Sequence, residues 1–260
     1  ILYLSKNLNK TNTMKKISTI IFLFITTISF SQNIITDRPD QTESSSVVSF
    51  KSLQIEAGVL FLRSEGVQLN TYPSVLWRYG LSEKFEIRVL TQFETKEVLN
   101  STWKESGISD LQIGTKIQLF KKENVNTQIA FVSHLIIPTA KRELTNDKIG
   151  TINKLSISHS ISEKIGVGYN IGYDYFGTGN GNLTYSLAFG FSLSEKLSFY
   201  LEPFGQFGEF KNHLASFDTG FTFLSTTNLQ FDISYGTSLN YGMNYFSTGV
   251  SWNINRNSKK

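Results

Sequence analysis

A short polar turn, Ser194-Glu195-Lys196, divides the stretch from Gly190 to Leu201 into two arms in which bulky apolar residues alternate with small or polar ones. Alternation with a period of two predicts a strand with one apolar face, and two such arms around a tight turn predict a β-hairpin. The same turn recurs at 82–84 and at 162–164, again between alternating arms. The chain is therefore interpreted as one hairpin repeated many times, and an all-β fold is predicted.

Arms of this kind continue along most of the chain, and the alternation gives about twelve of them. Short turns begin near residues 81, 121, 161, 193 and 224 and alternate with mostly longer connections, among them polar loops at 95–107 and 139–149. Most arms have about nine to eleven residues, the length that a tilted strand needs to cross a bilayer. Their alternating parts are residues 53–61, 75–79, 85–93, 111–119, 127–131, 155–157, 165–175, 183–191, 197–201, 215–223, 229–235 and 246–254.

An even number of strands, with short turns at one end and longer loops at the other, is typical of outer-membrane barrels. We therefore predict a transmembrane antiparallel up-and-down β-barrel of about 12 strands, with short periplasmic turns, longer extracellular loops and both termini on the periplasmic side. The barrel is assigned to residues 53–254 and is followed by a polar tail, 255–260. Within one strand, Pro203 predicts a bulge or a lost ladder bond.

Charged residues of the predicted strands fall on the face opposite the bulky one. A basic residue on the lipid face near the bilayer midplane costs roughly 2–4 kcal/mol, so the charged face is predicted to line the lumen. A soluble sandwich shows the same alternation with its faces exchanged. Aromatic residues near strand ends, such as Trp77 and Trp252, favour the membrane. The candidate solute path consists of Glu56, Arg78, Glu86, Arg88, Glu94, Lys116, Asp174, Glu202, Asp218 and Asp232.

The first 31 residues have the pattern of a secretory leader. A basic start at Met14-Lys15-Lys16 precedes an apolar run from Ile17 to Phe30, and small residues place cleavage after Ser31. The run has about 14 residues, fewer than the roughly 20 that a membrane-spanning helix needs, although a retained anchor is the alternative. Removing the leader's four lysines lowers the 25 basic residues to 21, equal to the 21 acidic ones. We therefore expect secretion through a cleaved signal peptide to the outer membrane, lipid contact and no nucleic-acid partner.

A polar segment, residues 32–52, separates the leader from the first predicted strand. It is rich in turn-forming residues, and its charges can pair internally or reach neighbouring elements. Two interpretations stay open: a solvated lead-in, or a segment that enters the barrel mouth. Its candidate motif consists of Asp37, Arg38, Pro39, Asp40, Thr42 and Glu43.

This motif carries a resemblance to a known family. The run Asp-Arg-Pro-Asp-x-Thr-Glu-Ser after a signal peptide, followed by a strand that begins Leu53-Gln54-Ile55, resembles the phenol-degradation MetA-pathway transporter family of outer-membrane β-barrels. The remaining resemblance is one of patterning over residues 32–254. It implies a Gram-negative, porin-like outer-membrane transporter and says little about the solute.

The residues that could support catalysis are poorly placed for it. His134 adjoins Ser133 and His159 lies between two serines, but adjacent residues of a strand point to opposite faces, so neither pair gives a nucleophile with its base. The glycine-rich stretch 177–181 lacks the lysine and the helix of a phosphate loop. Cysteine is absent, and no metal-ligand spacing occurs. We expect no enzyme, no catalytic residues, no cofactor and no metal.

The predicted strand number bears on function, because eight strands leave an interior filled by side chains and about 16 to 18 leave a wide channel. Twelve strands predict a narrow lumen in which the charged residues either form a constriction or merely satisfy one another. The favoured function is an outer-membrane channel or transporter for small solutes, hydrophobic or aromatic ones among them. The alternatives are a non-conducting structural or adhesive barrel that binds a partner through its extracellular loops, and a secreted soluble β-protein.

Overall fold

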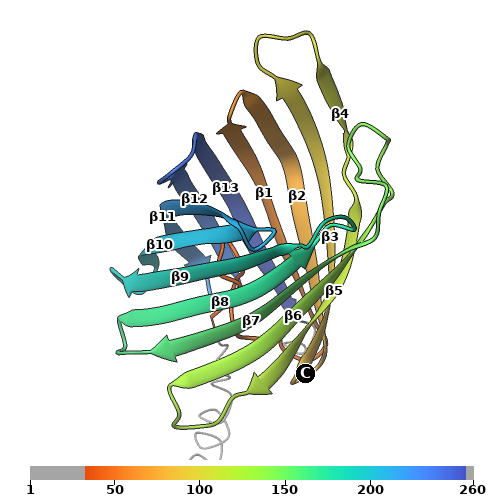
Figure 1. Ribbon diagram of the computed structural model, residues 1–260. Helices are drawn as coiled ribbons and strands as arrows, with labels where there is room; N and C mark the ends of the chain where they lie inside the picture. The colour runs from red at the N-terminus through yellow and green to blue at the C-terminus, as the bar shows by residue number, and fades with distance from the viewer. Residues whose placement is uncertain (1–32, 256–260) are drawn as a thin grey trace, which may run out of the picture. The chain divides into compact units, whose positions relative to one another are not determined.

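The computed structural model describes residues 33–255, and the predicted signal peptide lies outside them. The residues from Ile34 onward form one compact unit built from strands (Figure 1). Among the described residues, no helix is long and apolar enough to cross a membrane. The strands are β1 (Ser52–Ser64), β2 (Val67–Ser82), β3 (Phe85–Val98), β4 (Lys104–Ile108), β5 (Leu111–Phe120), β6 (Thr127–Ile137), β7 (Gly150–Ser160), β8 (Ile165–Tyr175), β9 (Asn182–Ser192), β10 (Leu197–Gly208), β11 (Asn212–Thr226), β12 (Leu229–Ser238) and β13 (Met243–Asn255).

The strands close into an antiparallel barrel. Consecutive strands pair, except that β5 pairs with β3 and not with β4. Because β1 also pairs with β13, the sheet of the described residues has no free edge except where short β4 extends β3. Twelve of the 13 strands form the closed barrel, and β4 is the additional strand. The register aligns Ser52 of β1 with Asn255 of β13, so both ends of the barrel sequence lie at one rim. The predicted up-and-down barrel is confirmed.

The polar turns all lie at the rim that holds the two ends of the barrel sequence. In the three Ser-Glu-Lys turns the serine hydroxyl accepts a hydrogen bond from the backbone N–H of the lysine, each time at 3.2 Å. A serine that bonds to the backbone two residues ahead stabilises a tight reversal, which explains why the same three residues recur. We call this the periplasmic rim, following the convention for short turns in such barrels.

Two connections at the opposite, extracellular rim differ from the prediction. No strand is predicted between residues 61 and 75, yet β1 and β2 continue to a two-residue turn at Glu65–Gly66. Both φ angles of this turn are positive, as hairpin turns favour. The polar loop predicted at 95–107 is wrong, because β3 extends to Val98 and β4 pairs with it. Polar residues occupy both faces of this hairpin, so the alternation that identifies a half-apolar strand is missing there.

The strand that contains Pro203 is uninterrupted. β10 keeps a continuous register with β11 through this residue, while positions 202 and 203 have no partner on β9. No register shift occurs there, so of the two predicted irregularities, a bulge or a lost ladder bond, the structure has the lost pairing.

The two faces of the barrel have reversed polarity compared with a soluble protein. Large apolar side chains of the bulky face, such as Trp77, Ile171 and Phe231, are exposed on the outer surface. The largest fully buried side chains are instead charged, with Arg78, Arg88 and Lys116 at 0% exposure. An apolar exterior around a polar interior is the arrangement of a membrane barrel.

Candidate functional site in the barrel lumen

Residues 34–49, which we call the plug, occupy the lumen as a re-entrant segment (Figure 1). The plug enters at the periplasmic rim, where the Ile34 N–H donates to the carbonyl of Thr227 at 2.8 Å. It returns to the same rim, where the Lys51 N–H donates to the carbonyl of Gly80 at 2.8 Å. Between these points Asp37, Thr42, Ser45 and Ser46 are buried. The polar N-terminal segment therefore enters the barrel, which is the second of its two predicted interpretations.

Asp37 of the plug binds three cations of the barrel wall. Its carboxylate lies 3.1 Å from the guanidinium of Arg78, 2.7 Å from that of Arg88 and 2.8 Å from the Lys116 ammonium. Burial by itself raises the pKa of the Asp37 carboxyl, but the charges of Arg78, Lys116 and Arg88 outweigh it and hold this pKa well below its usual value of 3.8. Asp37 is therefore ionised and held in place by a charge opposite to its own.

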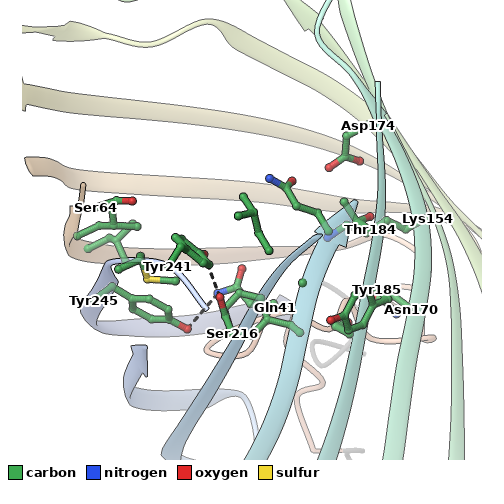
Figure 2. A pocket seen from close by; sticks show the side chains of 18 residues that line it. Gln41, Ser64, Lys154, Asn170, Asp174, Thr184, Tyr185, Ser216, Tyr241 and Tyr245 are labelled. Atoms are coloured by element: carbon green, nitrogen blue, oxygen red, sulfur yellow. Dashed lines mark hydrogen bonds between the residues drawn. The ribbon is translucent and has the colours of Figure 1, made fainter. Parts of the chain in front are cut away.

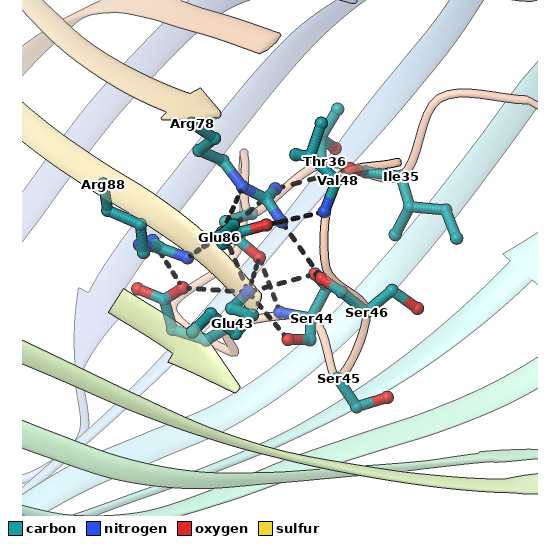
Figure 3. A network of polar contacts seen from close by, with 12 residues as sticks. Ile35, Thr36, Glu43, Ser44, Ser45, Ser46, Val48, Arg78, Glu86 and Arg88 are labelled. Carbon is teal, nitrogen blue, oxygen red and sulfur yellow. Dashed lines mark hydrogen bonds and ion pairs between the residues drawn. The ribbon is translucent and has the colours of Figure 1, made fainter. Parts of the chain in front are cut away.

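Further acids neutralise the cations of the barrel wall around Asp37 (Figure 3). Glu43 of the plug lies 2.8 Å from Arg88, and this cation together with Lys116 lowers the pKa of Glu43 against the effect of burial. Arg78 also pairs with Glu56 at 2.8 Å and with Glu86 at 2.9 Å.

Each of these two wall acids also accepts a backbone N–H of the plug. Asp37 N–H donates to Glu56 at 2.9 Å, and Val48 N–H donates to Glu86 at 2.6 Å. The wall charges on β1, β2, β3 and β5 thus serve to hold the plug. We call this group the anchor, and it consists of Asp37, Glu43, Glu56, Arg78, Glu86, Arg88 and Lys116.

The opposite side of the lumen is acidic. Glu202 and Asp218 are fully buried and lie directly opposite each other on β10 and β11. Glu202 accepts hydrogen bonds from the Gln41 N–H at 2.7 Å and from the Thr42 hydroxyl at 2.5 Å. Asp218 accepts a hydrogen bond from the Tyr245 hydroxyl. Among the described residues neither carboxylate has a cation within ion-pair distance, so hydrogen bonds from uncharged groups hold the plug on this side.

The remaining predicted positions are less involved in this network. Asp232 pairs with Arg38 of the plug at 2.9 Å, and Pro39 is buried beside it. Glu94 is half-buried on β3 and takes no part in the anchor. Asp174 is also half-buried, and one of its carboxylate oxygens has no hydrogen-bond partner among the described residues.

Sequence reasoning missed the uncharged polar side chains that hold the plug. These lie at the same alternating positions as the charged residues, a signal that could have identified them. Ser158 and Ser186, for example, lie 2.5 Å and 2.6 Å from the hydroxyls of Ser45 and Thr42. The others that bond to the plug are Gln54, Gln118, Gln128, Asn170, Gln230, Tyr245 and Ser247.

Cavities lie on both sides of the plug. The outer one has a volume of about 500 Å³, and Gln41 of the plug lines it (Figure 2). Apolar and aromatic side chains from β1, β10, β11 and β13 line one part of it, and Lys154, Asn170 and Asp174 line another. Two smaller cavities of about 260 and 290 Å³ lie against other parts of the plug, and Asp40 and Tyr200 line both. Lys154 lies on the same face of its strand as the residues of the candidate solute path, and it was not included among them.

The histidines have structural partners. His134 accepts a hydrogen bond from Arg88 at 2.9 Å, while Ser133 donates to Asn153 on the other face of β6. His159 contacts Thr127 and Tyr169, on the neighbouring strands β6 and β8. In the part of the chain that the structure describes, no group of three or more His, Cys, Asp or Glu residues is arranged to hold a metal ion.

A closed barrel of 12 strands with an apolar exterior and a charged lumen defines an outer-membrane barrel of the porin-like channel class. Residues 36–254 match the family described as "Putative MetA-pathway of phenol degradation", and the chain belongs to this family. The family resemblance inferred from the N-terminal motif is thereby confirmed. Among curated proteins, none matches the chain.

Solved structures with the same fold are outer-membrane channels. The COG4313 outer membrane channel from Pseudomonas putida F1 is 12% identical, with a TM-score of 0.68 over 81% of this chain and 98% of that one. The KdgM porin is 10% identical, with a TM-score of 0.55 over 77% of this chain and 99% of that one. The NanC porin is 8% identical, with a TM-score of 0.51 over 76% and 98%. At these identities the similarity establishes the fold.

Proposed function

We propose that this protein is an outer-membrane channel for small solutes whose lumen is closed at rest by its own N-terminal segment. The observation that carries the proposal is a charged lumen with cavities on both sides of a plug that belongs to the same chain. A structural barrel has no need of open space inside it, because side chains alone can fill a narrow lumen.

The proposed solutes are small and partly hydrophobic, aromatic compounds among them. The outer cavity supports this class, because Leu60, Phe204, Leu214 and Met243 line it beside tyrosine rings. Small-molecule sites are typically apolar pockets with a few polar groups that orient the ligand, and this cavity has that composition. The family's association with phenol degradation points in the same direction.

Planar-bilayer recordings and liposome swelling test the proposal. The purified full chain is compared with a variant that lacks residues 34–49, after migration on a gel with and without heating has shown that both barrels are folded. We expect rare, small currents from the full chain and at least tenfold larger conductance from the variant. Folded barrels that pass no solute in either form would contradict a channel function.

We also propose that the protein reaches the outer membrane through a cleaved signal peptide. Cleavage after Ser31 would leave Gln32 as the first residue, two positions before the plug. Mass spectrometry of the protein extracted from outer membranes tests this. A mass that includes residues 14–31 would instead indicate a retained leader.

An adhesive barrel is the second candidate, favoured by a connected structure at the extracellular rim. The β3–β4 hairpin and the loop between β6 and β7 are joined by an ion pair between Glu105 and Lys141, and Leu144 packs near Gly107. Deleting residues 99–103 and 141–147 together separates the two functions. If adhesion is the function, cell attachment is lost while permeability is unchanged.

A further inference from the structure

The outer cavity and the smaller cavities meet the plug at adjacent residues. Gln41 lines the outer cavity, whereas Asp40 lines both of the smaller ones. The wall beside this point is formed by Glu202 on β10 and Asp218 on β11, with Tyr245 of β13 in reach of Gln41 at 3.2 Å. The barrier between the cavities is therefore thinnest where the plug faces the acidic wall.

The contacts at this point are weaker than those of the anchor. The plug bonds here through Gln41 and Thr42, which carry no charge, whereas in the anchor Asp37 and Glu43 bind buried cations. Each anchor contact joins two opposite charges, and separating a buried ion pair leaves both of them unsatisfied, whereas a bond from Gln41 or Thr42 to Glu202 involves at most one charge. Glu202 and Asp218 place two carboxyl groups directly opposite each other on paired strands, where a second negative charge beside the first is unfavourable.

Two buried polar atoms at this point lack partners, and they provide independent support for a ligand. The Tyr200 hydroxyl is without a hydrogen-bond partner among the described residues, although only 7% of the residue is exposed and it lines both smaller cavities. One oxygen of the fully buried Asp218 carboxylate is equally unpartnered. Buried polar groups are almost always paired. The unpartnered Tyr200 hydroxyl beside both smaller cavities, with the unpartnered Asp218 oxygen on the neighbouring strand, therefore indicates a position that a passing solute or ion occupies.

The charge of this passage has one dominant sign. Asp40, Glu202 and Asp218 form no ion pair with any described residue, and Asp174 in the outer cavity also forms none. Lys154 lines the outer cavity together with Asp174, and Arg38 is paired with Asp232. Acidic side chains that line a constriction select for cations.

We propose that the plug opens between residues 40–42 and strands β9–β11, while the anchor stays closed, and that the passage so formed prefers cationic solutes. The residues that determine this selectivity are Asp40, Glu202 and Asp218. The proposal rests on the proposed channel function and deepens it by adding a gate position and a charge class.

Disulfide locks test the gate position, and the chain contains no cysteine that could interfere. The hydroxyls of Thr42 and Ser186 lie 2.6 Å apart at the gate, and those of Ser45 and Ser158 lie 2.5 Å apart beside the anchor. Cysteines at either pair are therefore within bonding reach. Oxidising Thr42→Cys/Ser186→Cys should lower conductance at least tenfold, reversibly with reductant, and oxidising the matched pair Ser45→Cys/Ser158→Cys should change it less than twofold.

The possible results of the lock experiment have separate meanings. Equal effects of both locks, or no effect of the gate lock once a gel shift has shown the disulfide, would overturn the proposed gate. If the full chain never conducts but the plug-deleted variant does, the proposed gate is also overturned, while the channel function is still supported. Absence of current from every form, the plug-deleted one included, would refute the channel function itself.

Reversal potentials in a tenfold KCl gradient test the selectivity. The full chain should have a potassium-to-chloride permeability ratio above one, and Asp40→Asn/Glu202→Gln/Asp218→Asn should reduce it at least threefold. Glu195→Gln, in the turn between β9 and β10, is the control and should leave the ratio unchanged. A ratio below one, or an unchanged ratio in the triple variant, would overturn the charge class; if that variant does not fold, Asp218→Asn alone is measured with the same criteria.

Discussion

The two sides of the plug are held by different chemistry. Towards β2, β3 and β5, Asp37 and Glu43 meet the buried cations Arg78, Arg88 and Lys116. Towards β9–β11, neutral side chains and backbone of the plug meet carboxylates that have no cation. Taking an ion pair out of water is costly, but separating one that is already buried costs more, because both charges are then unsatisfied. The difference indicates one side that stays closed and one that can open.

Breaking the anchor should have the largest effect. Asp37→Asn removes the one carboxylate that pairs with all three buried cations, and removing one partner of a buried pair typically costs about 3–5 kcal/mol. We expect a plug that dissociates, a conductance at least tenfold higher and a lower midpoint of urea unfolding. Planar-bilayer current and tryptophan fluorescence measure these.

The matched control is Asp147→Asn in an exposed loop, which should change neither quantity. If Asp37→Asn behaves like this control, the ion pairs of the anchor do not hold the plug.

Removing a contact of the plug with β9–β11 should also raise conductance, but by less. Thr42→Val removes the hydroxyl that bonds to Glu202 and Ser186, and leaving a buried acceptor unsatisfied costs about 1–3 kcal/mol. We expect more frequent openings in single-channel records, with an unfolding midpoint close to that of the unmodified chain. Ser45→Ala, which removes the corresponding bond to Ser158, should leave the opening frequency unchanged. An effect of Ser45→Ala as large as that of Thr42→Val would mean that the plug moves as one body.

Raising the pH should weaken the plug on its acidic side only. Burial raises the pKa of Asp40 well above its usual value of 3.8, and the charges of Glu202, Asp218 and Asp37 act in the same direction. Tyr200 and Tyr245 are the other titratable side chains that face this point. The closed state therefore binds the Asp40 proton more tightly than the open state does, so closure is favoured at low pH and lost as the pH rises above 3.8 through the raised pKa.

Asp37 has the opposite dependence. Its pKa is lowered in the closed state, so its contribution is present above 3.8 and is lost only as the pH falls through the lowered value. Conductance measured against pH should rise towards alkaline pH, and Asp40→Asn should remove that rise. A conductance that falls with rising pH would contradict the assignment of Asp40 to the gate.

The sequence was sufficient for the barrel because the membrane imposes a simple rule on each strand. Bulky residues at alternating positions, as in Ile165 to Tyr175, must face lipid, and this fixes which side chains face the lumen. The rule fails where the chain leaves the membrane, which is why the hairpin of β3 and β4 was predicted as a loop. It also gives no information on which lumen residues meet one another.

The contacts of the plug depend on that missing information. Asp37 contacts Lys116 79 positions further along the chain, and Arg38 contacts Asp232 at a separation of 194. Parity showed that Arg78 and Glu86 face inward, but it could not show that the N-terminal segment lies between the walls. The division into a cationic and an acidic side follows only from closing the barrel, because that places β2, β3 and β5 opposite β9–β11.

The smallest effect is expected from an ion pair outside the lumen. Lys141 and Glu105 pair at the extracellular rim with side chains 39% and 31% exposed, and exposed pairs contribute about 0–1 kcal/mol. Glu105→Gln should shift the urea midpoint by less than the scatter between preparations, and conductance should stay at the level of the unmodified chain. The contrast with Asp37→Asn compares one exposed ion pair with a buried cluster of three, since both changes remove a single carboxylate charge beside a lysine. A change in conductance from Glu105→Gln would mean that the extracellular rim also controls access to the lumen, and the acidic side of the plug would no longer suffice as the gate.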